Sequence, residues 1–256
     1  MSEEGNPHPA EPKAGEIILA DGAPPAPIPE PGGALQAFDE LLKAPHQVAL
    51  RARQAGSNRP AFLLLAGSVV GFAVYGAVAG LFTGGSQVLV SAFKAPLIVL
   101  LSLALCLPSL YIFSALAGAP LSRRPFLHVV AGFSGMLALL LIGLMPISWL
   151  FSVSSRSLLF VVWLHAIAWI VAASFGARFL SRSFDLPEVG KAIFLWLLLF
   201  ALVSFQVSTW LRPVLWRAPG APIFESGKLF FLEHLDKIAN PPPPAKKPAA
   251  PTAPKK

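Results

Sequence analysis

The sequence predicts an all-α integral membrane protein, a bundle of about five transmembrane helices with flanking amphipathic helices and disordered termini. Apolar residues make up 55% of the 256 residues and charged residues only 13%, whereas roughly a quarter of the residues in a soluble domain are charged. Five apolar stretches each approach the ~20 residues that a helix needs to cross ~30 Å of hydrocarbon. These continuous runs lack the alternation typical of a transmembrane β-barrel.

The region before the first span divides into two parts. Residues 1–33 are polar and Pro-rich, without the apolar core of a cleavable signal peptide, and we expect them to be disordered. Residues 34–57 bring Leu35, Phe38 and Leu41 to one face of a helix. We therefore predict an amphipathic helix at the membrane surface. The alternative is a helix whose apolar face packs on the protein's own loops.

The transmembrane domain is predicted to occupy residues 58–216. Its spans must be helices, because lipid offers no partner to unpaired backbone groups. Pro108 and Pro146 are expected to bend the second and third spans. The five predicted spans are residues 61–82, 95–116, 126–150, 158–180 and 192–211.

Beyond the fifth span the chain regains an apolar pattern. Residues 217–240 form an aromatic segment that we expect to lie at the membrane interface, with Phe230 and Phe231 as contacts for a partner. Residues 241–256 consist mainly of Pro, Ala and Lys and predict an extended, disordered tail.

Basic residues are distributed unequally between the two ends of the spans. Because the cytoplasmic side of a membrane protein is richer in Lys and Arg, we predict a cytoplasmic N-terminus and a C-terminus across the membrane. This arrangement, together with anionic lipid, also accounts for the net charge of +7 without a nucleic-acid partner. The richer side holds Arg51, Arg53, Arg59, Arg123, Arg124, Arg178, Arg182 and Lys191, and the other side holds Lys94, Arg156, Arg212 and Arg217.

Pairs of small residues four positions apart occur in two spans and are typical of close helix packing. We expect packing within one molecule, with the two small-residue faces meeting each other, and a dimer interface is the alternative. These helix-packing residues are Gly67, Gly71, Gly76 and Gly80 in the first span and Ala168, Ala172 and Gly176 in the fourth.

His165 and Gln206 are the candidate intramembrane polar sites. Ionisable residues inside a membrane often mark a proton or substrate path. No Asp or Glu occurs in the five spans, however, and a proton relay usually includes a carboxylate. We therefore favour a structural role for His165, either hydrogen-bonded to a serine of a neighbouring helix or facing a wet crevice. Gln206, together with nearby Ser204, Ser208 and Thr209, is interpreted as an interhelical hydrogen-bonding group.

Enzymatic motifs are absent from the sequence. It contains no metalloprotease, hydrolase or phosphate-loop signature, and its five histidines are too scattered to suggest a metal site. The single cysteine, Cys106, cannot form an intrachain disulfide. We therefore predict a protein that is not an enzyme and that uses neither a cofactor nor a metal.

Several stretches resemble the bacterial Yip-like membrane proteins. They are Lys94-Ala-Pro-Leu, Leu107-Pro-Ser-Leu-Tyr111-Ile-Phe, Leu121-Ser-Arg-Arg124 and Pro146, and the fifth-span ending Ser208-Thr-Trp-Leu-Arg-Pro213 is similar to a group of uncharacterised bacterial polytopic proteins. The resemblance covers roughly residues 62–231. It implies about five helices, a cytoplasmic N-terminal region and a place in the bacterial inner membrane, and it supplies no catalytic residues.

The leading functional hypothesis is a non-enzymatic scaffold that recruits partners to a membrane complex. The first alternative is a transporter or channel component with a polar path through the fourth and fifth spans. The second is a membrane-shaping or lipid-handling protein. The expected partners are membrane lipids and other membrane proteins or a second copy of the chain.

Overall fold

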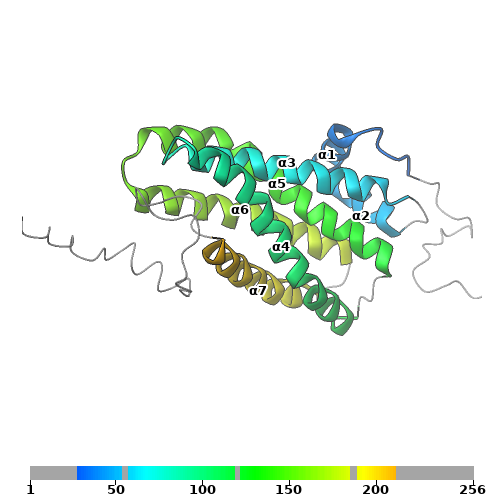
Figure 1. Ribbon diagram of the computed structural model, residues 1–256. Coiled ribbons are helices and arrows are strands. Elements are labelled where there is room, and N and C mark those ends of the chain that lie inside the picture. Colours follow the sequence, from blue (N-terminus) through cyan, green and yellow to red (C-terminus); the bar gives the residue numbers. More distant parts are fainter. Residues whose placement is uncertain (1–27, 54–56, 119–121, 185–188, 212–256) are drawn as a thin grey trace, which may run out of the picture.

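The computed structural model describes residues 28–53, 57–118, 122–184 and 189–211, and across these residues the chain is all helical (Figure 1). The predicted fold class is therefore confirmed. The segments 217–240 and 241–256, with Phe230 and Phe231, and most of segment 1–33 lie outside the described residues. The helices are α1 (Ala34–Lys43), α2 (Pro45–Arg53), α3 (Arg59–Gly80), α4 (Gln87–Leu116), α5 (Arg123–Ser154), α6 (Leu158–Phe184) and α7 (Val189–Trp210).

Five helices, α3 to α7, are long and apolar enough to cross a membrane. The protein is therefore an integral membrane protein. The main departure from the predicted bounds is α4, which begins at Gln87 rather than near residue 95. Gly84 and Gly85 have φ angles of 72° and 58°, a conformation that glycine adopts without strain. They complete the turn after α3, and no helix breaker separates them from residue 95.

The outward faces of the spanning helices carry large, exposed apolar side chains. On α6, Trp163, Ile167 and Ile170 are exposed, whereas His165 and Ala168 are buried. In water, such an apolar surface over five helices would cause the protein to associate or aggregate. Lipid is the solvent that matches it.

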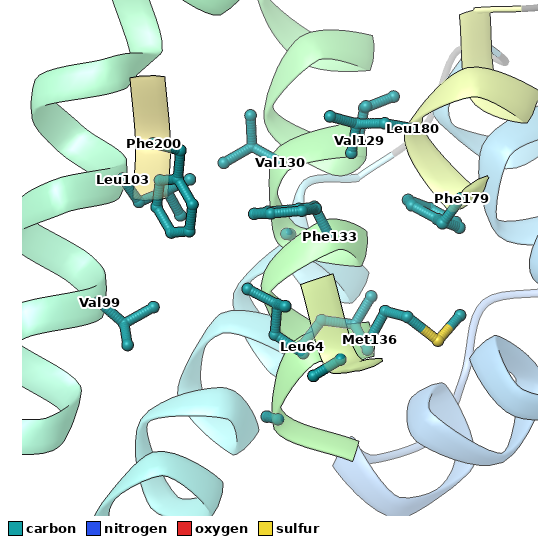
Figure 2. Close-up of a cluster of buried hydrophobic side chains, with 14 of the residues drawn as sticks. Leu64, Val99, Leu103, Val129, Val130, Phe133, Met136, Phe179, Leu180 and Phe200 are labelled. Atoms are coloured by element: carbon teal, nitrogen blue, oxygen red, sulfur yellow. The ribbon is translucent and has the colours of Figure 1, made fainter. Parts of the chain in front are cut away.

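Helix α5 lies at the centre of the bundle, and every residue from His128 to Ala138 is buried. Figure 2 shows the Phe133 ring directed toward Phe200 of α7, with Phe179 of α6 on another side of α5. Two glycines make the α5–α6 packing reciprocal. A Cβ added at Gly132 would overlap the Phe179 ring, and one added at Gly176 would lie 2.8 Å from the Phe133 ring.

A buried tryptophan joins α7 to α4. The Trp196 indole nitrogen donates a hydrogen bond of 3.0 Å to the Cys106 carbonyl oxygen, and its ring stacks on Phe200 with 5.4 Å between centroids. An indole N–H in an apolar interior needs such a partner. The bond therefore fixes the rotation of α7 against α4.

Helices α1 and α2 pack on the bundle itself. Phe38 of α1 lies against Gly67 of α3, and Leu41 of α1 contacts Gly135 of α5. Of the apolar face that we expected to rest on the membrane surface, Phe38 and Leu41 are thus covered by the protein's own spans, because the two glycines leave room for these side chains, whereas Leu35 stays exposed. The segment is divided at Pro45, which has no N–H to continue α1 and instead begins α2.

Polar contacts hold this N-terminal helix pair in place. Glu40 of α1 and Arg51 of α2 form a salt bridge of 2.7 Å, with side chains only 22% and 10% exposed. Glu30 accepts a hydrogen bond from the Ser57 amide, and the Arg59 side chain donates to the Gly32 carbonyl. Ordered contacts thus begin before Ala34, within the segment that we predicted to be disordered.

Candidate functional site

The glycines of α3 contact three different neighbours. A Cβ at Gly71 would lie 3.1 Å from the Ala138 Cβ of α5, and one at Gly76 would lie 2.5 Å from the Ser91 carbonyl oxygen of α4. Gly80 also faces α4, and Gly67 faces α1. All four glycines thus allow close contacts within one chain.

The small-residue faces of α3 and α6 do not meet, contrary to our expectation. On α6, Ala168, Ala172 and Gly176 are buried, and Gly176 lies against Phe133 of α5. Helices α3 and α6 meet instead through large rings, because Phe72 stacks on Trp169 with 6.1 Å between centroids. Bulky residues fill the wider gap that α5 leaves between these two helices.

A cluster of four buried polar side chains joins α3, α5 and α6. The Tyr75 hydroxyl lies 2.8 Å from His165 Nδ1, and Ser152 Oγ lies 3.3 Å from His165 Nε2. Ser148 Oγ is 3.5 Å from the Tyr75 hydroxyl. The predicted serine partner of His165 is therefore present, together with a tyrosine that the sequence analysis did not identify.

Both tautomers of a neutral His165 ring satisfy this cluster, because neutral imidazole offers one donor and one acceptor. In one tautomer the Tyr75 hydroxyl donates to Nδ1, and Nε2–H donates to Ser152. In the other, Nδ1–H donates to Tyr75, and the Ser152 hydroxyl donates to Nε2. The cluster needs no charge, which suits an apolar surrounding.

The cluster lies nearer one end of the bundle than its middle. His165 is seven residues, about 10 Å, from the start of α6. Ser152 is two residues from the end of α5, and exposed Trp163 marks nearly the same level. This end is the one opposite α1 and α2 (Figure 1).

The pairing of Ser152 with His165 has the residue types of a nucleophile and its base. The third group is a neutral tyrosyl hydroxyl, where hydrolases hold a carboxylate, and all four side chains are at most 5% exposed. No set of three His, Cys, Asp or Glu in the described residues is placed to hold a metal. The cluster therefore links three helices by side-chain hydrogen bonds.

Gln206 stands apart from the His165 cluster. It lies near the end of α7, and in the described part of the chain its Oε1 and the Ser204 hydroxyl are buried without a hydrogen-bond partner. Thr209 donates to the Gln206 carbonyl within α7. The expected interhelical bond from the Gln206 side chain is therefore not formed among the described residues.

Sequence reasoning missed Tyr75, Ser148 and Ser152. One signal was available: Ser148 and Ser152 are four residues apart and therefore share a face of α5. Tyr75 offered a weaker one, as one of only two tyrosines in the chain. Neither pattern says which helix lies opposite, which is why the pairing itself could not be predicted.

Comparisons of the chain with protein-family models, curated proteins and solved structures found no match. The Yip-like resemblance therefore stays a prediction.

Proposed function

We propose that this protein is a non-enzymatic scaffold that recruits a partner at the membrane. We place it, as a Yip-like protein, in the bacterial inner membrane with a cytoplasmic N-terminus. The observation that carries the scaffold proposal is that the α1–α2 pair is fixed on the bundle and exposes leucines on the face that points away from it.

The outer face of the α1–α2 pair exposes apolar side chains, whereas a surface without a partner in water is usually polar. Leu35 and Leu42 of α1 are 89% and 62% exposed, and Leu50 of α2 is 39% exposed. Asp39 and Lys43 flank them as an exposed ion pair of 2.8 Å. An apolar centre with a charged rim is the usual composition of a protein–protein contact.

The rigidity of the pair favours binding. Phe38, Leu41 and the Glu40–Arg51 salt bridge fix it on α3 and α5. A partner that docks on a fixed surface does not have to order that surface, and ordering costs about 0.5–1.5 kcal/mol per long side chain. The His165 cluster supports the same proposal, because its hydroxyl and imidazole groups are already paired with one another.

The proposal is tested by substituting the exposed leucines. Leu35→Ser with Leu42→Ser should remove specific proteins from a tagged pull-down out of mild detergent, quantified by mass spectrometry. The matched control is Leu105→Ser on α4, which is 59% exposed on a spanning helix. It should leave the captured set unchanged.

A photo-crosslinking residue identifies what touches each position. At Leu42 we expect adducts with protein, and at Leu105 adducts with lipid. The same captured proteins in all variants, with lipid adducts alone at Leu42, would show that the outer face of α1 meets only the bilayer.

A further inference from the structure

An open groove lies between the end of α6 and the start of α7. Its volume is about 320 Å³. One side is basic and the other is apolar. The groove is lined by Ala177, Arg178, Ser181, Arg182, Gly190, Ile193 and Phe194.

Two arginines one helical turn apart provide the basic side. The Arg178 guanidinium lies 5.3 Å from the centre of the Phe175 ring, so it is directed back along α6 rather than toward the helix end. In the part of the chain that the structure describes, neither Arg178 nor Arg182 has an acidic partner. Asp185 and Glu188, in the connection to α7, lie outside that part.

The depth of these arginines follows from the length of α6. Trp163 is 60% exposed near the opposite end of the helix, and exposed tryptophans mark a membrane interface. Arg182 is 19 residues, about 28 Å, beyond it, which matches the ~30 Å hydrocarbon core. Arg178 is therefore about one turn inside the boundary, where a cation needs a counter-charge.

We propose that the groove binds one anionic phospholipid. Its phosphate pairs with Arg178 and Arg182, and an acyl chain runs over exposed Phe194 of α7, beside the buried Ile193. Guanidinium groups bind phosphate through paired, charge-assisted hydrogen bonds. The apolar side, with Phe194 63% exposed, suits a lipid chain and gives a free phosphate ion nothing to contact. This site is independent of the partner surface on α1.

The first test removes the charge of the site. Native mass spectrometry of the detergent-purified protein would compare phosphatidylglycerol with phosphatidylcholine. We expect preferential binding of phosphatidylglycerol, weakened about 10- to 30-fold by Arg178→Gln with Arg182→Gln, since each basic residue contributes substantially to anionic-lipid binding. Arg123→Gln with Arg156→Gln removes the same charge from residues that do not line the groove and should keep the preference.

The second test closes the groove and leaves both arginines in place. A Cβ added at Gly190 meets no atom of the described residues within 4 Å, and Gly190 lines the groove, so Gly190→Leu adds bulk there without a clash inside the described structure. It should weaken phosphatidylglycerol binding severalfold. Gly143→Leu is the matched control, because Gly143 of α5 is also open to its surroundings. That variant should bind as the parent does.

Two outcomes would overturn the site. Equal phosphatidylglycerol binding by the parent, the Gly190→Leu variant and the Arg178/Arg182 variant would mean that the arginines only orient α6 and complement its C-terminal dipole. If glycerol 3-phosphate competed for the groove as strongly as the whole lipid does, the ligand would be a soluble anion and not a phospholipid. The Gly190→Leu comparison decides the matter even if the double arginine variant does not insert.

Discussion

His165 illustrates how a polar side chain is accommodated among apolar helices. Each ring nitrogen has a hydroxyl partner, one from α3 and one from α5. Loss of the ring removes the imidazole partner of the Ser152 and Tyr75 hydroxyl groups and leaves Tyr75 only its 3.5 Å contact with Ser148, where water does not replace the missing bonds. A single substitution at this position therefore acts on the contacts of three helices.

We predict that His165→Leu lowers the free energy of unfolding by about 1–2 kcal/mol, because two intramembrane hydrogen bonds of roughly 0.6 kcal/mol each are lost. His165→Gln should cost less, since an amide also offers a donor and an acceptor. Unfolding in detergent with increasing SDS measures both. The control is Ser154→Ala, since Ser154 bonds only to the Leu150 carbonyl of its own helix. Equal stability of the Leu variant and this control would contradict the role of the cluster.

The glycines of α3 should differ in their tolerance of a methyl group. At Gly76 a Cβ would meet the α4 backbone, whereas at Gly71 the nearest atoms are the side chains of Ile142 and Ala138. Gly76→Ala should therefore destabilise by about 1–3 kcal/mol, and Gly71→Ala by less. Thermal unfolding in detergent gives the order, with Gly143→Ala as the neutral reference. A harmless Gly76→Ala would mean that α3 and α4 readily move apart.

At the level of elements, the spanning helices could be predicted because an apolar run of 20 residues has few alternatives to a membrane helix. The bounds of α4 were missed, since Lys94 suggested an end that the helix passes through. The docking of α1 could not be predicted. It depends on Gly67 of α3 and Gly135 of α5 lying at the same level along the bundle axis, where together they leave a recess. Residue spacing within one helix does not reveal how far another helix is shifted along that axis.

Phe38 should control the attachment of the N-terminal helix pair. Phe38→Ala empties the recess at Gly67 and should cost about 1–2 kcal/mol, less than the 3–5 kcal/mol typical of a fully buried phenylalanine, because the ring is partly exposed. Hydrogen exchange should become faster in α1 and α2 and stay unchanged in α5. Leu35→Ala, at a position 89% exposed, is the control. Unchanged protection in the Phe38 variant would show that the Glu40–Arg51 salt bridge is sufficient.

Over the whole molecule, the two ends of the bundle differ in chemistry. The exposed tryptophans Trp149, Trp163 and Trp210 lie near the end where α5 and α7 finish and α6 begins. The arginines at the start of α5 and the end of α6 lie at the other end, together with α1 and α2 (Figure 1). This asymmetry agrees with the orientation that the sequence predicts.

The orientation is tested with a reporter enzyme that is active only outside the cytoplasm. An odd number of spans, with the basic end inside, predicts activity when the reporter follows Lys256 and silence when it follows Gly33. A reporter that is active in cytoplasm should give the reverse pattern. The same activity at both positions would require an even number of spans.

The recess that receives Phe38 and Leu41 also sets an order of events during synthesis. Helix α1 is made first, but Gly135 belongs to the third span, about 100 residues later in the chain. At the ~5–20 residues per second of translation, roughly 5–20 s pass between synthesis of the helix pair and synthesis of the part of α5 that completes its recess. During that interval its apolar face is open to chaperones, lipid or a neighbouring chain, and synthesis of α5 closes it.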